Sequence, residues 1–328
     1  MWRSFLTTGL TALVLATSQP ASAQNGPYKK GDDVTVLIGF KAGGGSDAVA
    51  QLVQPFLAKE LGVDFVNQYL PGATGAIAWT QLAKQTKPDG QTISITNTPM
   101  LMTNYIMNKA ITYNIKEITP IANIVTDSGI VVVSAKSPFK SLQDLIEAAK
   151  TKPKTVTVGN SGVGGDDFFT TVLLEQAAEV RFQKVPFQGD GPSWAAAMGG
   201  KIDASFNNVG ITFPQIREGN LRALAVFAEK RLPELPDVPT VKELGYDVVA
   251  GSSRGYSGPA GFPEDARRQL VEGFRRVVAN PEFQKAAAAQ AMNIDFIPGD
   301  EYSAYLKRQE KEFRGVWESV KDQVRAAN

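Results

Sequence analysis

A strand, a glycine-rich turn and a helix follow one another twice in this sequence, and this repeated pattern restricts the fold more than any other feature. The first copy runs from the apolar run 34–40 through Gly43-Gly44-Gly45-Ser46-Asp47 into a helix predicted over 47–61. The second runs from a short strand through the loop 160–167 into a helix predicted over 168–178. Strands that alternate with helices indicate an α/β fold with parallel strands and right-handed crossovers. We expect two α/β lobes, each presenting a helix N-terminus at the carboxyl end of its sheet, where such sheets bind ligands.

The alternation of strands and helices continues along the rest of the chain. The first helix has one apolar face, and Gly62 is expected to end it; the face consists of Val49, Leu52, Val53, Phe56 and Leu57. Further strands are predicted at 65–70, 91–96, 130–135, 185–187, 204–206 and 221–227. Further helices are predicted at 76–84, 141–150, from 266 onward and over 301–324.

The first 23 residues have the composition of a secretory signal peptide. Arg3 gives a positive start, the run 5–16 is mostly apolar, and Ala21-Ser22-Ala23 has the small-x-small form of a cleavage site. This run is too short to span a membrane, and the alternative is a buried N-terminal helix. We expect cleavage after residue 23 and export to the periplasm.

Removal of residues 1–23 leaves 305 residues (328 − 23), more than the commonest single domain contains. We therefore predict two lobes, the first formed by residues 24–124 and 251–328 and the second by residues 125–250. The hinge between the lobes is expected where the chain crosses, near residues 122–127 and 247–254.

Composition excludes several classes of function. The chain has 34 Lys+Arg and 33 Asp+Glu, and loss of Arg3 with the signal would leave 33 of each, so no global basic field favours nucleic acid or an anionic membrane. It has no Cys and no His. Thiol nucleophiles, disulfides and imidazole bases are thus excluded, and zinc loses its commonest ligands. We expect a binding protein with no cofactor and no metal rather than an enzyme.

The first glycine turn does not fit the two common phosphate-binding motifs. A P-loop needs a Lys after its last glycine, whereas here Lys41 precedes the glycines and Ser46 follows them. Gly43-x-Gly45-x-x-Ala48 satisfies the dinucleotide pattern, but the next strand carries Asn67-Gln68 where an acid should hold a ribose. Two interpretations stay open: a backbone nest for a carboxylate, and a tight turn selected for packing.

Other polar residues follow predicted strands and are candidates for the same cleft. They are Thr96-Asn97-Thr98, Gln188-Gly189-Asp190 and Asn207-Asn208. Arg254, between small residues, is a candidate for a bidentate carboxylate clamp. A salt bridge that holds the hinge is the equally weighted alternative for Arg254.

Nine segments in this order resemble one family along the whole mature chain. They are GFKAGGGSD (39–47), LPGATGAIA (70–78), KPDGQTI (87–93), SPFKSLQDLIEAAK (137–150), VGNSGVGGDD (158–167), VPFQGDGP (185–192), GGKIDASFNN (199–208), LRALAVFAEKRLPELPDVPTVKELGY (221–246) and GPAGFP (258–263). The chain resembles the Bug-type periplasmic receptors, the substrate-binding proteins of tripartite tricarboxylate transporters.

The resemblance implies a two-lobed periplasmic binding protein of the type II-like Venus flytrap kind, with a cleft between the lobes. It implies that the cleft closes on a small organic acid, which the protein, a monomer that does not insert into the membrane, delivers to transporter membrane subunits. The first-lobe contacts would be Gly43, Gly44, Gly45, Ser46 and Asp47, and the second-lobe contacts would be Asn160, Ser161, Gly164, Gly165, Gln188, Gly189, Asn207 and Asn208.

Two departures from the family pattern bear on the ligand. Many members carry Asp where Asn207 stands, and many carry an aromatic residue near the position of Arg254, whose Arg-Gly-aromatic context is similar to the citrate-binding branch. Both departures favour a citrate-like di- or tricarboxylate. The alternatives are an aromatic acid or an acidic amino acid as ligand, and a role as the sensing partner of a membrane kinase.

Overall fold

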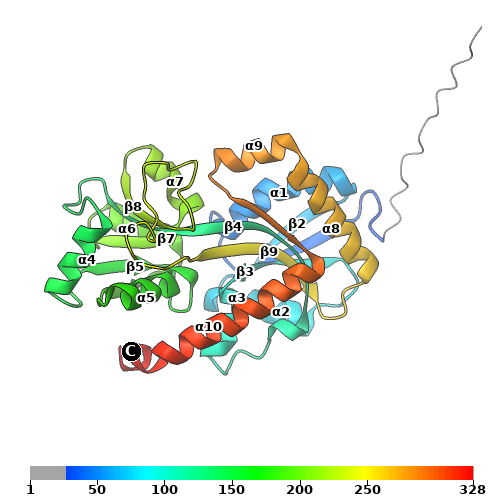
Figure 1. Cartoon of the computed structure of the whole chain (residues 1–328). Coiled ribbons are helices and arrows are strands. Elements are labelled where there is room, and N and C mark those ends of the chain that lie inside the picture. Colours follow the sequence, from blue (N-terminus) through cyan, green and yellow to red (C-terminus); the bar gives the residue numbers. More distant parts are fainter. Residues whose placement is uncertain (1–26, 328) are drawn as a thin grey trace, which may run out of the picture.

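Two long antiparallel strands, β4 (Ile118–Ser134) and β9 (Gly251–Pro259), form the centre of the fold. The structure of the protein is a computed structural model that describes residues 27–327, so the predicted signal peptide lies outside the described residues. The strand order is β2-β1-β3-β9-β4-β7-β5-β6, with β8 and β10 also paired to β4. The first part of β4 pairs with β9, and residues 129–134 pair with β7 and β8, so this one strand extends through both lobes (Figure 1).

The first lobe surrounds three parallel strands, β1 (Asp33–Ile38), β2 (Asp64–Tyr69) and β3 (Thr92–Thr98). Its sheet is covered by α1 (Gly45–Leu61), α2 (Ala76–Gln85), α3 (Met100–Met107), α8 (Glu264–Ala279) and α9 (Pro281–Ala289). The apolar face of α1 packs in one core with that of α8 because both have side chains at helical spacing, including Val53, Leu57, Leu270 and Phe274.

The second lobe repeats this arrangement on a smaller scale. Strands β5 (Thr157–Asn160), β6 (Gln183–Pro186), β7 (Ala204–Asn208) and β8 (Leu221–Phe227) are combined with helices α4 (Leu142–Thr151), α5 (Asp166–Ala178), α6 (Asp190–Met198) and α7 (Val209–Arg217). Strands β6, β5 and β7 are parallel. Helix α4 begins with a capping box in which Ser141 and Asp144 satisfy each other's backbone N–H groups.

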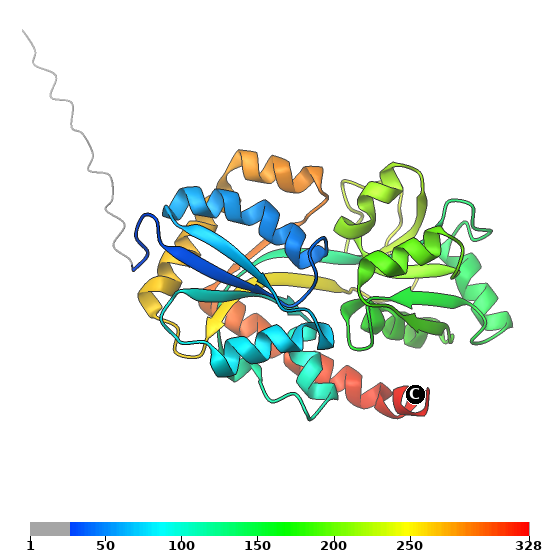
Figure 2. The ribbon, with the colours of Figure 1, turned by 180° about the vertical axis from the view of Figure 1, so that it is seen from behind.

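The end of the chain connects the two lobes a third time. Strand β10 (Ile294–Pro298) pairs with the first half of β4, and α10 (Gly299–Ala327) then runs from the first lobe along the side of the second (Figure 2). Early in α10, Tyr302 and Leu306 are buried in the first lobe. Later, Trp317 packs with Phe168 and Phe169 of α5, so α10 links α5 to the first lobe.

The α/β fold predicted from the sequence is confirmed, and Gly62 ends α1 in the left-handed conformation as expected. The prediction of a parallel sheet is only partly right, since β9, the second half of β4, β8 and β10 pair antiparallel. Helices α3, α6 and α7, strand β9 and the first half of β4 were not predicted, and β10 interrupts the stretch predicted to be helical from residue 266 onward. Within residues 27–327, no helix combines the length and the apolar character needed to cross a membrane.

Candidate functional site

The first glycine turn leads from β1 into α1, whose first residues Gly45, Ser46 and Asp47 are buried. Gly44 is the N-cap of α1 and no side chain caps the helix. The N–H groups of the first turn have no carbonyl partner within a helix, and the helix dipole makes this end attractive to an anion. Gly43 has a φ of 82°, a left-handed conformation that an L side chain rarely adopts.

Asp47 fixes the shape of this turn rather than facing a ligand. Its Oδ2 accepts a hydrogen bond from the Gly43 N–H at 2.8 Å, and its Oδ1 accepts one from the Tyr69 hydroxyl at 2.6 Å. Although partial burial raises the pKa of Asp47, these hydrogen bonds outweigh it and the net pKa is lowered. Asp47 therefore stays ionised and braces the loop from within.

The three polar residues at the end of β3 divide between two faces of the strand. The hydroxyl of Ser46 donates to Oδ1 of Asn97 at 3.0 Å, which ties Asn97 to the start of α1. Thr96 instead contacts Ser257 and the hydroxyl of Tyr302 in α10, and Thr98 lies on that same side because side chains alternate along a strand. Asn97 is thus brought to the first glycine turn, and the two threonines are not.

The second glycine turn leads from β5 into α5, and it also leaves a helix start without a side-chain cap. Gly165 is the N-cap of α5, and Gly164 has a φ of 89°. Asn160 is fully buried, and its Oδ1 accepts from the N–H of Gly162 while its Nδ2 has no hydrogen-bond partner among residues 27–327. The N–H of Ser161 donates to Asp167 at 3.2 Å. The two predicted helix starts are therefore both present.

Arg254 on β9 lies between these two helix starts. It is only 4% exposed, its Nη2 donates to Oδ1 of Asn208 at 2.8 Å, and its Nη1 is 3.4 Å from Oδ2 of Asp127. A Cβ added to Gly45 would be 2.6 Å from Nη2, so the guanidinium packs directly on the start of α1. Its Nε has no partner in the described part of the chain. Arg254 thus touches both lobes and makes the hinge salt bridge, one of its two predicted roles.

Four carboxylates gather on the second-lobe side of Arg254, and of these only Asp190 was among the candidates for the cleft. Asn208 donates from Nδ2 to Asp166 at 2.7 Å, and Asp167 and Asp190 lie beside Asp166. Burial raises the pKa of Asp166 and of Asp127 to about 6, opposed in both by the positive charge of Arg254. Burial and the neighbouring acids raise the pKa of Asp167 well above its usual range. Within residues 27–327, no group of three or more Asp or Glu side chains, these four included, is arranged so that it could hold a metal ion.

The lobes already touch across the cleft in this structure. The hydroxyl of Thr103 in α3 donates to the carbonyl of Gly164 at 2.7 Å, and a Cβ on Gly164 would be 3.1 Å from the sulfur of Met107. Next to Arg254 and Asp127 a space of about 10 Å³ remains, lined also by Gly45 and Gly210. The contact between lobes therefore includes the predicted loop 160–165 directly.

Three predicted second-lobe residues lie further from this network. Asn207 alternates with Asn208 and turns to the α6 side of β7, where its Nδ2 donates to Ser205. Gln188 is exposed, and Gly189, with a φ of 109°, is the N-cap of α6. Of the pair Asn207-Asn208, it is thus Asn208 that connects Arg254 with α5.

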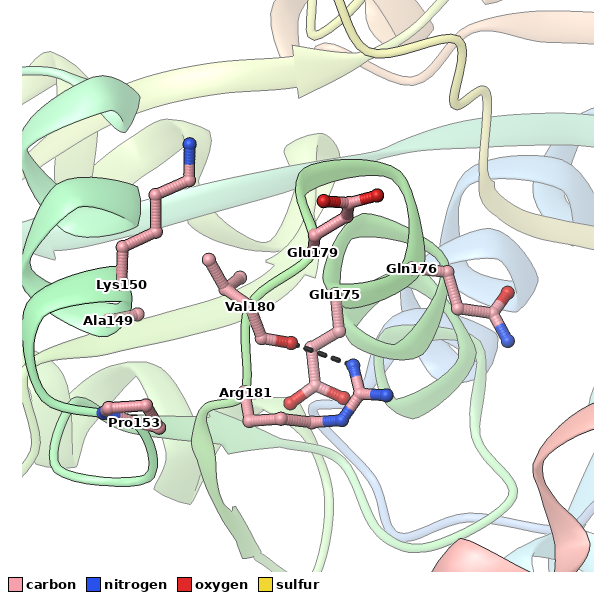
Figure 3. A pocket seen from close by; sticks show the side chains of 8 residues that line it. All are labelled: Ala149, Lys150, Pro153, Glu175, Gln176, Glu179, Val180 and Arg181. Carbon is pink, nitrogen blue, oxygen red and sulfur yellow. Dashed lines mark hydrogen bonds between the residues drawn. The ribbon is translucent and has the colours of Figure 1, made fainter.

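A surface hollow on the second lobe lies apart from this site. A cavity of about 540 Å³ lies between α4 and α5 on the outer side of the second lobe, lined by Lys150, Glu175 and Arg181 among others (Figure 3). Glu175 accepts from the N–H of Phe182 at 2.7 Å and from Lys184, and Arg181 donates to the carbonyl of Val180. Its polar groups already have partners in the protein, so it offers few convergent groups to a ligand.

Comparison with known proteins agrees with this geometry. The sequence profile of the Tripartite tricarboxylate transporter family receptor matches residues 49–316. The UPF0065 protein in the gbd 5' region of Cupriavidus necator is 28% identical over 310 residues, 94% of each chain. The periplasmic binding protein BugD superimposes with a TM-score of 0.81 at 26% identity over 88% of this chain and 98% of its own.

A second solved structure shares the fold at lower identity. MatC from Rhodopseudomonas palustris with bound malate has a TM-score of 0.79 at 24% identity, covering 87% of this chain and 98% of its own. The profile match spans most of the chain and agrees with the two-lobed periplasmic binding fold. The chain therefore belongs to the tripartite tricarboxylate transporter receptor family, whose members are solute-binding receptors of the Bug type.

Proposed function

We propose that this protein captures a small organic di- or tricarboxylate in the periplasm and delivers it to the membrane subunits of a tripartite tricarboxylate transporter. One observation carries the proposal: the uncapped start of α1 lies against the buried guanidinium of Arg254. Backbone N–H groups, a helix dipole and a guanidinium are three groups that favour a carboxylate, and here they meet at one place.

We propose that the lobes comprise residues 24–124 with 251–328 and residues 125–250, and that binding works by hinge closure. The hinge would lie where β4 and β9 pass together between the lobes, near Asp127 and Ser252, which are partners in the antiparallel register. A ligand shifts a hinge toward closure only if it makes contacts that the open form lacks. Contacts with both glycine turns at once meet this condition.

A second ligand class is favoured by the carboxylates on the second-lobe side. Asp166, Asp167 and Asp190 would repel a second ligand carboxylate and would attract a hydrogen-bond donor or an ammonium group. An acidic amino acid, bound by its carboxylate at α1 and by its amino group near α5, is therefore the alternative ligand.

A thermal-shift screen of the purified protein tests the binding proposal. Citrate, tricarballylate, succinate, malate and glutamate should raise the melting temperature, whereas the matching amides should not, because the proposed nest recognises negative charge. If no carboxylate raises it, the proposal is wrong. For delivery, deletion of the gene should abolish uptake of the acid that binds, and a point variant that cannot bind should fail to restore it.

A further inference from the structure

We propose that Asp127 is a specificity-determining residue: as the internal counter-ion of Arg254, it limits how many negative charges the cleft accepts in a ligand. The inference rests on the proposed capture of a carboxylate and adds which residue selects among carboxylates. It is a statement about relative affinities, so a purely structural role for Asp127 would not reproduce it.

The position of Asp127 is fixed by contacts from three elements. It lies on β4 where the chain crosses between the lobes and is 4% exposed. Its Oδ1 accepts from the N–H of Gly210 in α7 at 3.0 Å, and its Oδ2 is 3.4 Å from Nη1 of Arg254. A Cβ on Gly210 would lie 3.0 Å from Oδ2, so the carboxylate fits tightly between α7 and the guanidinium.

Asp127 therefore occupies a side of Arg254 that a ligand carboxylate would otherwise take. Nη2 donates to Asn208, and the space left beside Gly45 and Asp127 is about 10 Å³, about enough for one water molecule. A ligand that reaches the start of α1 consequently meets a guanidinium whose charge is already balanced.

The charges around Asp127 and Arg254 determine whether Asp127 strengthens or weakens the binding of a highly charged ligand. The charges of Asp190 and Arg254 both shift the pKa of Asp127. The same two charges shift the pKa of Asp166, so these four residues form one electrostatic unit. Each added ligand carboxylate feels the Asp127 charge at a distance of several ångströms in a site that excludes water. The repulsion grows with the number of ligand charges, so Asp127 disfavours a trianion more than a dianion.

Asp127→Asn tests this inference because it removes the charge and keeps an oxygen that can accept from Gly210. Three acids on one propane skeleton would be titrated by calorimetry at pH 8: butyrate, glutarate and tricarballylate, with one, two and three carboxylates. In the variant, the affinity for tricarballylate relative to glutarate should rise about tenfold, equivalent to about 1.4 kcal/mol.

Asp203→Asn is the matched control, since Asp203 bonds to Thr157 in the second lobe rather than to Arg254. Asp203→Asn should leave the ratio of the affinities for tricarballylate and glutarate unchanged. Asp127→Ser, which is smaller and also neutral, provides a second measurement if Asp127→Asn folds poorly. If both neutral variants change all affinities by one common factor, the inference is overturned. If the wild-type protein binds none of these acids or the wider panel above, it is instead the proposed function that fails.

Discussion

Nη2 of Arg254 donates a hydrogen bond to Oδ1 of Asn208 at 2.8 Å. Arg254 belongs to β9 and packs on Gly45 at the start of α1, while Asn208 belongs to β7 and donates to Asp166 at the start of α5. These contacts connect the two helix N-termini through two side chains. The first-lobe end of this connection is cationic and the second-lobe end is acidic, which gives the cleft a defined polarity.

Replacement of Arg254 by Ala should weaken both ligand binding and folding. Loss of a charge pair to a buried carboxylate is expected to cost roughly 2–5 kcal/mol of binding free energy. It also leaves Asp127 buried without its cation, which should cost about 3–5 kcal/mol of stability. Calorimetry and urea denaturation would measure the two losses.

The double variant Arg254→Ala with Asp127→Asn separates the two effects of Arg254. Stability should recover in large part because no unpaired charge is left, whereas binding should stay weak. Unchanged affinity in Arg254→Ala would restrict Arg254 to its role in the hinge salt bridge.

Replacement of Gly45 by Ala should reduce affinity about tenfold, or 1.4 kcal/mol. The new Cβ would be within 2.6–2.9 Å of three guanidinium atoms, so Arg254 has to move away from the start of α1. Gly315→Ala in α10 is the control: a Cβ there meets nothing within 4 Å, and the change should only stabilise the helix by up to about 1 kcal/mol. Equal affinities for the two variants would argue against a ligand at this helix start.

Stability should decrease as the pH rises from about 4 to about 6. The pKa of Asp127 and of Asp166 is about 6 in the folded protein, against an ordinary value of 3.8, so between these values the folded state binds more protons than the unfolded state. Each such group then lowers the free energy of unfolding by at most about 1.4 kcal/mol per pH unit. Below this range the lowered pKa of Asp47 acts in the opposite direction.

Urea denaturation at pH 4, 5, 6 and 7 measures this dependence. Asp166→Asn should flatten the curve between pH 4 and 6, and the exposed Asp89→Asn should leave it unaltered. Stability that increases steadily from pH 4 to pH 6 would mean that the buried acids do not carry raised pKa values.

Replacement of Trp317 by Ala should destabilise the protein by about 3 kcal/mol because it opens a cavity between α10 and α5. Trp317 is buried against Phe168 and Phe169, and Phe313 makes a ring contact with Phe169 at 5.4 Å. Trp317→Phe should lose much less stability. In the Ala variant, amide hydrogen exchange should be faster in α10 and at the start of α5. Faster exchange confined to α10 would indicate that the two helices are not coupled.

What the sequence predicted best depends on residues close together in the chain. The glycine turn before α1, the capping box at Ser141 and the end of α1 at Gly62 each follow from a few neighbouring residues. Helices α6 and α7 were not predicted because Gly191-Pro192 and Pro214 interrupt the helical pattern. Pro192 lies in the first turn of α6, where Pro is tolerated, whereas Pro214 lies inside α7.

Strand β9 and the acidic side of the cleft could be identified only from the tertiary structure. Residues 251–255 are Gly-Ser-Ser-Arg-Gly, which is atypical of a strand, but β9 lies between β3 and β4 where small residues are needed: a Cβ on Gly255 would be 2.5 Å from the carbonyl oxygen of Ala122. Asp127, Asn208 and Arg254 meet only through the strand register, and Asp166-Asp167 look in sequence like ordinary acids at a helix start.

Calorimetric titration of the purified protein with citrate, tricarballylate, succinate, malate, glutamate and terephthalate tests the central claim most directly. We predict saturable binding of at least one di- or tricarboxylate with one site per chain, and at least tenfold weaker binding of that acid by Gly45→Ala and Arg254→Ala. Absence of binding by every acid in this panel, or equal binding by the wild type and both variants, would contradict the account.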